Sequence, residues 1–338
     1  MIKESNGYSL QKHNTFHIDA KADKFIEYTT VGDLKRILAS AEIQKTPVLH
    51  IGGGSNLLFV ADFKGIILHS LIKGIEITNE TDDFIYIRVG AGEIWDEFVA
   101  TCVEKGWGGV ENLSLIPGEV GASAVQNIGA YGAEAKDCIG KVEVVELSSG
   151  EERSLTNAEC CFSYRQSIFK SEYKNKYIVT YVTFKLSRCP NYNLEYGNIK
   201  TELEKYPEIN LSTIRQAVIS IRRAKLPDPE VEGNAGSFFM NPVVTAEKFE
   251  SLYKEYPEIP HYDAGTGLIK LPAAWLIDQC GWKGRTVGHA GVHDKQALVL
   301  VNRGGATGSE IVELSEMIRT SVKNKFGVEI HPEVNFIG

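Results

Sequence analysis

Residues 48–56 read VLHIGGGSN, so that four residues of strand character run directly into three glycines. Glycine has no Cβ, and successive glycines therefore leave backbone N–H groups open to an anion such as a pyrophosphate. Two familiar nucleotide-binding patterns do not fit this loop. Leu57 stands where the dinucleotide pattern needs its third glycine, and the phosphate-loop pattern lacks its lysine. By itself, the loop is compatible with an anion site or with a tight turn.

A second loop rich in small residues follows at 116–132, with the sequence IPGEVGASAVQNIGAYG. It contains more glycine and alanine than turns alone require, which is typical of a backbone that closely approaches a flat or phosphorylated ligand. A glycine-rich crossover packed under a sheet is the alternative. Two such loops in one region favour a large nucleotide cofactor. Glu119 is unfavourable beside phosphates unless its side chain points away.

Runs of β-branched and aromatic residues surround these loops, and apolar residues at helical spacing lie between them. We expect strands at 48–51, 66–68, 84–89, 141–147 and 177–186. We expect helices that include 34–41, 95–103, 214–221, 272–280 and 311–322. Strands at 297–301 and 328–336 bracket the last helix and predict a mixed sheet there. The pattern is that of an α+β protein with a boundary near residue 190.

Composition excludes several classes of protein. The chain has 338 residues, enough for two or three domains, and its net charge of -8 argues against a nucleic-acid groove. No apolar run is long enough for membrane insertion, and the polar start lacks a signal-peptide pattern, so we expect a cytoplasmic protein. The six cysteines lack CxxC spacing, which favours reduced thiols over a metal cluster or a disulfide framework.

Three further segments contain candidate catalytic residues. Arg165 lies in FSYRQS (162–167), Ser237 in GNAGSFFMNP (233–242) and Glu333 in HPEV (331–334). Taken singly, each has an ordinary structural explanation: a surface ion pair, a buried serine and an edge-strand carboxylate. His289 and His293 have the spacing of a metal pair, but the glycines around them oppose a helix, so we expect no metal.

Together and in this order, the segments closely resemble the UDP-N-acetylenolpyruvoylglucosamine reductase family. The resemblance covers nearly the whole chain and includes Tyr196 of the longer family type, which has a tyrosine on a substrate loop. It implies an FAD-binding region of the vanillyl-alcohol-oxidase (PCMH) type over 1–190, in two subdomains split near residue 70. It further implies an α+β substrate-binding domain over 191–338.

The resemblance also implies which residues bind the cofactor and the substrate. The FAD contacts would be Gly52, Gly53, Gly54, Ser55, Asn56, Gly118, Gly121, Ser123, Gln126, Asn127 and Gly129. The substrate contacts would be Tyr196, Lys225, Asn241 and Gln296, with Tyr196 and Lys225 on the diphosphate. Two residues depart from the family pattern, because an acidic residue usually stands at His331 and Glu119 is an atypical neighbour for phosphates.

By the same resemblance, Arg165, Ser237 and Glu333 match the catalytic trio. Arg165 would stabilise an enolate, Ser237 would supply the proton that quenches it, and Glu333 would orient its neighbours. The implied activity is NADPH-dependent reduction of UDP-N-acetylglucosamine enolpyruvate to UDP-N-acetylmuramate through FAD, in peptidoglycan and cell-wall biosynthesis. We expect a monomer. An FAD oxidase that uses oxygen and a flavin-free nucleotide-sugar binding protein remain alternatives.

Overall fold

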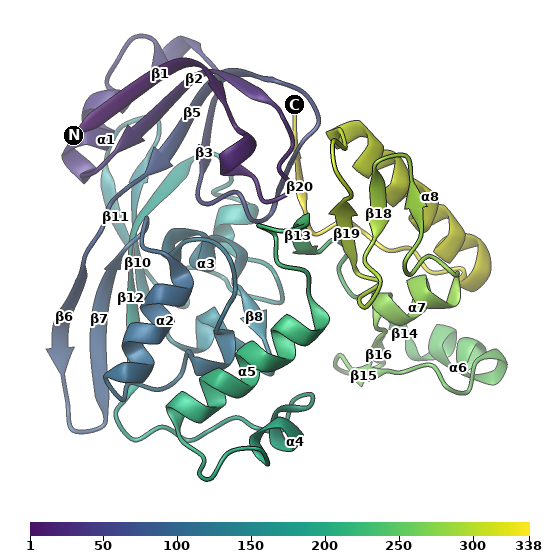
Figure 1. Cartoon of the computed structure of the whole chain (residues 1–338). Coiled ribbons are helices and arrows are strands. Elements are labelled where there is room, and N and C mark those ends of the chain that lie inside the picture. Colours follow the sequence, from purple (N-terminus) through teal and green to yellow (C-terminus); the bar gives the residue numbers. More distant parts are fainter. The chain divides into compact units, whose positions relative to one another are not determined.

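The computed structural model describes all 338 residues, and contacts between Cα atoms divide them into two compact units (Figure 1). The first unit contains residues 1–8, 22–53 and 64–224, and the second contains 9–21, 54–63 and 225–338. Residues 191–224 therefore belong to the first unit. We predicted that residues 1–190 bind FAD and that residues 191–338 bind the substrate. The division into units does not show which residues bind a ligand, so this assignment stays a prediction.

Two sheets form the first unit. The first has the order β1-β2-β5-β3 and consists of β1 (Ile2–Ser9), β2 (Lys21–Tyr28), β5 (Phe63–Ser70) and β3 (Val48–Ile51), of which β3 and β5 are parallel. The second is antiparallel with the order β11-β10-β12-β7-β6, from β11 (Glu152–Thr156), β10 (Ile139–Glu146), β12 (Tyr177–Ser187), β7 (Phe84–Gly90) and β6 (Ile75–Glu80). The five strands predicted in this half are thus confirmed.

Five helices of this unit each bury one apolar face. They are α1 (Val31–Leu38), α2 (Trp95–Glu104), α3 (Val120–Gln126), α4 (Ile199–Leu203) and α5 (Leu211–Lys225), with a hairpin of β8 (Gly129–Ala130) and β9 (Ala133–Glu134) after α3. On α2, Phe98 is 1% exposed, and its ring lies 4.8 Å from the ring of Phe184 on β12. Ala41 lies beyond the end of α1, so the predicted helix is three residues too long at that end.

The second unit has a different arrangement of strands. Its main sheet, ordered β13-β19-β18-β17, contains β13 (Gly233–Ser237), β19 (Val299–Asn302), β18 (Ala290–Val292) and β17 (Thr286–Val287). A smaller sheet, ordered β14-β16-β15, contains β14 (Val243–Thr245), β16 (Leu268–Lys270) and β15 (Tyr262–Asp263). The helices are α6 (Ala246–Glu255), α7 (Ala273–Gln279) and α8 (Gly308–Phe326). None of the helices in the chain combines the length and the apolar character that a membrane crossing requires.

The predictions of a mixed sheet and of a strand over 328–336 are wrong. All pairs in the main sheet are antiparallel, and the last strand, β20, is limited to Asn335–Ile337. Pro332 has no N–H to donate to a ladder, and it makes only an isolated bridge with Phe239. β20 pairs in parallel with β4 (Leu57–Phe59), which follows the first glycine loop.

Candidate active site

The first glycine loop follows β3, and the boundary between the two units falls between Gly53 and Gly54. Gly54 has φ of +67°, and a Cβ there would lie 1.9 Å from the carbonyl oxygen of His13. No other residue type fits this position without moving the backbone. Ser55 and Asn56 follow in the second unit, where Asn56 donates through Nδ2 to the carbonyl oxygen of Glu333 at 3.2 Å.

Gly52 and Gly53 of the first loop lie against the second loop inside the first unit. A Cβ built on Gly53 would be 3.6 Å from the Cα of Gly118, and one built on Gly52 would be 3.1 Å from Oε2 of Glu119. A side chain at Gly52 would therefore fill the space between the loops. The half-exposed backbone of these three glycines fits the pyrophosphate of a dinucleotide, because it offers peptide groups without side-chain obstruction.

Glu119 was the residue unfavourable for phosphate binding, and in the structure its carboxylate lies beside a histidine. The residue is 7% exposed, and its Oε1 lies 2.8 Å from Nε2 of His69 on β5. Burial alone would lower the pKa of His69, but hydrogen bonds with Glu119 and Glu27 outweigh it and raise the pKa above the usual value. An imidazolium beside Glu119 cancels the charge of the carboxylate.

The remaining predicted FAD contacts follow Gly118 along α3, and their side chains bond within the first unit. Ser123 donates through Oγ to the carbonyl oxygen of Val120 at 2.6 Å. Asn127 is fully buried and donates through Nδ2 to Oε2 of Glu134 and to the carbonyl oxygen of Ser163. Gln126 accepts at Oε1 from Nζ of Lys170 at 2.7 Å. Gly121 packs on Ala91, where a Cβ would lie 2.8 Å from that of the alanine.

Arg165 is held in a strained turn of the first unit. Its φ is +56°, which is uncommon for a residue with a side chain, and Ser163 and Gln166 exchange two backbone hydrogen bonds of 3.0 Å around it. Its Nη2 donates to the carbonyl oxygen of Gly129 at 2.8 Å. This bond connects the arginine to the second glycine loop.

A second arginine, Arg222 on α5, was not singled out in the sequence. Its Nε donates to the carbonyl oxygen of Leu115 at 3.2 Å. Burial lowers the pKa of Arg222, Tyr131 and Asp96 act in the opposite direction, and the positive charge of Arg165 lowers the pKa further. Arg222 therefore shares an electrostatic environment with Arg165. The sequence contains one signal for Arg222. It is a cation that comes four positions after the buried Val218 and one position after the buried Ile221.

Tyr196 is half-exposed and lies near Tyr131 in the same unit. A Cβ on Gly132 would lie 3.1 Å from the Cβ of Tyr196, and Tyr196 contributes to raising the pKa of Tyr131, after burial. Asn193 fastens this segment, since its Nδ2 donates to the carbonyl oxygen of Gly132 at 2.9 Å. Arg165, Arg222, Tyr131 and Tyr196 are thus neighbours, although the sequence separates them by up to 91 positions.

Ser237 and Glu333 come together in the second unit. Ser237 is exposed at the end of β13, where it pairs with Val299 of β19. The next residue, Phe238, accepts at its carbonyl oxygen from the backbone N–H of Glu333 at 2.8 Å. The rings of Phe238 and Phe239 are buried 5.1 Å apart, so this junction is fixed by packing.

Two of the predicted substrate contacts in this unit, Asn241 and Gln296, form hydrogen bonds within the protein. Asn241 accepts at Oδ1 from the backbone N–H of Ala273, at the start of α7, at 2.9 Å. Gln296 accepts from Leu298 through Oε1 at 3.4 Å and from Val299 through its carbonyl oxygen at 3.0 Å. Lys225 is exposed at the end of α5.

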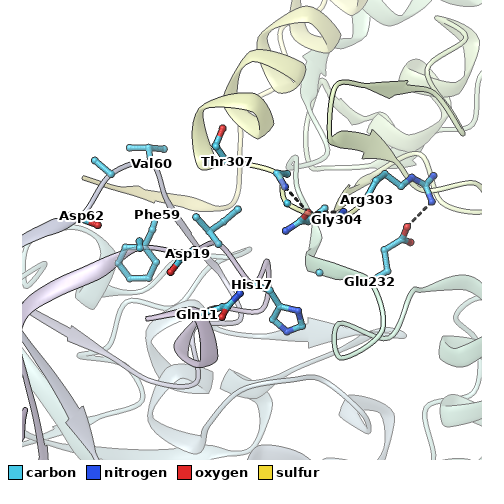
Figure 2. A pocket seen from close by; sticks show the side chains of 18 of the residues that line it. Gln11, His17, Asp19, Phe59, Val60, Asp62, Glu232, Arg303, Gly304 and Thr307 are labelled. Atoms are coloured by element: carbon cyan, nitrogen blue, oxygen red, sulfur yellow. Dashed lines mark hydrogen bonds and ion pairs between the residues drawn. The ribbon is translucent and has the colours of Figure 1, made fainter. Parts of the chain in front are cut away.

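The second unit also contains a cavity of about 970 Å³, and none of the predicted site residues lines it. Figure 2 shows Glu232 facing Arg303 there, with Oε1 and Nη1 2.5 Å apart. Asp19 and Asp62 lie on the opposite wall (Figure 2). In the whole chain, no group of three or more histidine, cysteine, aspartate or glutamate side chains is placed to hold a metal ion.

Comparisons with known proteins agree along the whole chain. A family model described as the C-terminal domain of UDP-N-acetylenolpyruvoylglucosamine reductase matches residues 228–337, and an FAD binding domain matches 22–156. The reductase of Bacteroides fragilis is 58% identical over 330 residues, which cover 98% of this chain and 99% of that protein. The reductase of Porphyromonas gingivalis is 50% identical over 331 residues, 98% of each chain.

A solved structure confirms the fold. The crystal structure of UDP-N-acetylenolpyruvylglucosamine reductase from Thermus caldophilus is 22% identical and aligns with a TM-score of 0.70 over 100% of this chain and 99% of that chain. The predicted fold class, an FAD-binding region followed by a C-terminal α+β domain, is confirmed by this match and by the two family models. With these matches, the chain belongs to the UDP-N-acetylenolpyruvoylglucosamine reductase family.

Proposed function

We propose that this chain reduces UDP-N-acetylglucosamine enolpyruvate to UDP-N-acetylmuramate with NADPH, and that Arg165, Ser237 and Glu333 carry out the chemistry. Family membership supports the overall reaction, a step in the synthesis of peptidoglycan precursors. The chain is an FAD-dependent UDP-N-acetylmuramate dehydrogenase. The hydrogen bond between Glu333 and Phe238 is the observation that carries the residue assignment, because it places the carboxylate segment beside Ser237.

We assign FAD to the two glycine loops. Gly52, Gly53 and Gly118 would bind the pyrophosphate through their backbone, and Gly54, Ser55, Asn56, Gly121, Gln126 and Gly129 would line the same cofactor. Ser123 and Asn127 would act by holding the second loop, since their side chains bond to their own unit. When bound, FAD supplies the redox centre that takes a hydride from NADPH and passes it to the substrate.

Arg165 would stabilise the negative charge that develops on the enolpyruvyl group. A hydride added to the methylene carbon leaves charge on the neighbouring carbon and its carboxylate, and a guanidinium is a fixed donor for such charge. Its hydrogen bond to Gly129 orients the group in advance. Pre-oriented donors need little reorganisation during the reaction, which is the usual source of electrostatic catalysis.

Ser237 would hold the proton that the substrate carbon takes up. A serine hydroxyl is a weak acid, so it transfers this proton only to a strongly basic carbanion. Glu333 lies on the adjacent segment and would orient the hydroxyl or the guanidinium. This division of roles leaves reduction of the flavin independent of Ser237.

The diphosphate of the substrate would meet Tyr196 and Lys225, with Asn241 and Gln296 as further contacts. Arg222 adds a cation near Arg165 and Tyr131, and it would strengthen the attraction for the same anion. We also propose a monomer, which sedimentation of the purified protein tests by its mass.

The deciding experiment measures NADPH oxidation by the purified, flavin-loaded protein with and without UDP-N-acetylglucosamine enolpyruvate. We expect oxidation only when the sugar nucleotide is present. Rapid oxidation in air without it would identify an oxidase instead. A folded protein that binds the sugar nucleotide but no flavin would identify a binding protein.

A further inference from the structure

One buried histidine of the first unit lies between two carboxylates. His69 on β5 is 7% exposed; its Nε2 is 2.8 Å from Oε1 of Glu119, and its Nδ1 is 3.4 Å from Oε1 of Glu27 on β2. Only an imidazolium can donate from both ring nitrogens at once. The geometry of this triplet (Glu27, His69, Glu119) therefore favours the protonated ring.

The triplet lies directly behind the first glycine loop. Cβ atoms built on Gly52 and Gly53 would be 3.1 Å from Oε2 and 4.0 Å from Oε1 of Glu119, respectively. The carboxylate of Glu119 thus faces the backbone that we assign to the FAD pyrophosphate, whereas Glu27 is on the other side of the imidazole. An uncompensated charge at Glu119 would repel a pyrophosphate at this loop.

The charged and titratable groups around His69 have distinct roles. Lys3 on β1 lies 3.2 Å from Glu27 and offsets that carboxylate. His50 on β3 shares a 2.9 Å hydrogen bond with Tyr28, and burial and the charge of His69 lower the pKa of His50 to about 3, so it is neutral. Burial raises the pKa of Tyr28, which keeps its hydroxyl protonated. Among these groups, His69 is the one whose charge changes near neutral pH.

We propose that His69 is a positioning residue whose proton cancels the charge of Glu119 behind the pyrophosphate loop and thereby makes FAD affinity depend on pH. The inference rests on the proposed placement of FAD at the Gly52 loop. Because the two carboxylates raise the pKa of His69, the proton is lost at a higher pH than from an ordinary histidine. FAD affinity then falls as the pH rises, and bound FAD in turn raises the pKa of His69.

The test is the dissociation constant of FAD from the full chain stripped of its flavin, measured by quenching of flavin fluorescence between about pH 6 and about pH 9. We expect the constant to rise roughly 5- to 10-fold across the transition. The NMR signal of the His69 ring, assigned by its loss in His69→Gln, should titrate at a higher pH with FAD bound than without it.

Two matched variants separate this role from simple packing. Glu119→Gln removes the charge behind the loop and one of the two carboxylates that hold the His69 proton, so the transition should move to lower pH and FAD should bind more tightly than to the wild type at high pH. Glu27→Gln removes only the outer carboxylate, so the transition should keep its size and move to lower pH. If the triplet had a purely structural role, each variant would instead weaken FAD binding by the same factor at every pH.

A flat pH profile of FAD affinity over the range in which the His69 signal titrates would overturn the inference. The same holds if Glu119→Gln retains the wild-type transition. Both results remain informative if His69→Gln does not fold, because neither depends on the FAD affinity of that variant. The NMR signal of His69 can then be assigned from backbone correlations. Absence of FAD binding at every pH would instead contradict the proposed function.

Discussion

The backbone N–H of Glu333 donates a 2.8 Å hydrogen bond to the carbonyl oxygen of Phe238, the residue that follows Ser237. This bond joins two segments almost a hundred residues apart. The carbonyl oxygen of Glu333 in turn accepts from Asn56, whose loop also precedes β4. The proposed proton donor, its carboxylate neighbour and part of the first glycine loop are therefore one local structure within the second unit.

Ser237→Ala should separate the two halves of the reaction. Reduction of the flavin by NADPH does not need a proton from this hydroxyl, so its rate should stay within about 2-fold. Transfer to the enolpyruvyl substrate should slow by about 10²- to 10⁴-fold, the usual contribution of a positioned acid. Stopped-flow flavin absorbance measures both rates. Ser251→Ala, an exposed serine on α6, is the control; equal loss in both halves would rule out the proposed role of Ser237.

Arg222→Met should weaken substrate binding more than it slows flavin reduction. The variant removes a partly buried cation that shares its environment with Arg165. We expect KM for the enolpyruvyl sugar nucleotide to rise about 10-fold, which corresponds to about 1.4 kcal/mol. The neighbouring Arg223 is exposed, so Arg223→Met tests the effect of net charge alone. Similar KM values for the two variants would contradict a specific role of Arg222.

The stability of α8 should decrease in acid through Glu310. This residue accepts from the backbone N–H of Thr307 at 2.8 Å and lies 3.0 Å from Nδ1 of His289. The backbone bond from Thr307, followed by the bonds from His289, lowers the pKa of Glu310 from 4.5 to about 2. A carboxyl with a lowered pKa in the folded state stabilises above pH 4.5 and loses this contribution as the pH falls toward 2.

Glu310→Gln should therefore lower Tm at neutral pH and flatten its dependence on pH across that acidic window. Glu313→Gln is the control, because Glu313 is exposed on the same helix. Thermal melts followed by circular dichroism measure both variants. If Glu310→Gln shows the wild-type pH dependence, the capping interaction does not contribute to acid sensitivity.

Phe98→Ala should destabilise the first unit by about 3–5 kcal/mol, the range for removal of a buried phenylalanine ring. Phe98 packs between Trp95 and Phe184, and their ring centroids are 5.7 and 4.8 Å away. Urea unfolding followed by tryptophan fluorescence measures the change. Ile77→Ala on β6, where the side chain is 45% exposed, should stay within about 0.5 kcal/mol. Comparable losses for the two variants would contradict this view of the core.

Periodicity located the elements whose apolar residues decide their conformation. β3 has the predicted ends, α8 contains its predicted segment, and α7 is one residue shorter at each end than the predicted 272–280. β6 was not predicted because its six residues are exposed, so they carry no alternating apolar pattern. The predicted final strand failed for a local reason, because Pro332 interrupts the hydrogen bonding that a longer strand would need.

The sequence by itself determined the family, the α+β class, the two glycine loops and the identities of the proposed catalytic trio, because residue order and glycine placement are visible in one dimension. Only the tertiary structure decided that Glu119 meets His69, that Arg222 joins Arg165, and that Glu333 lies beside Ser237. Each pair is separated by 50 or more positions. Such contacts arise from strand pairing and helix packing, and the compensation of a buried charge depends on what lies a few ångströms away in space.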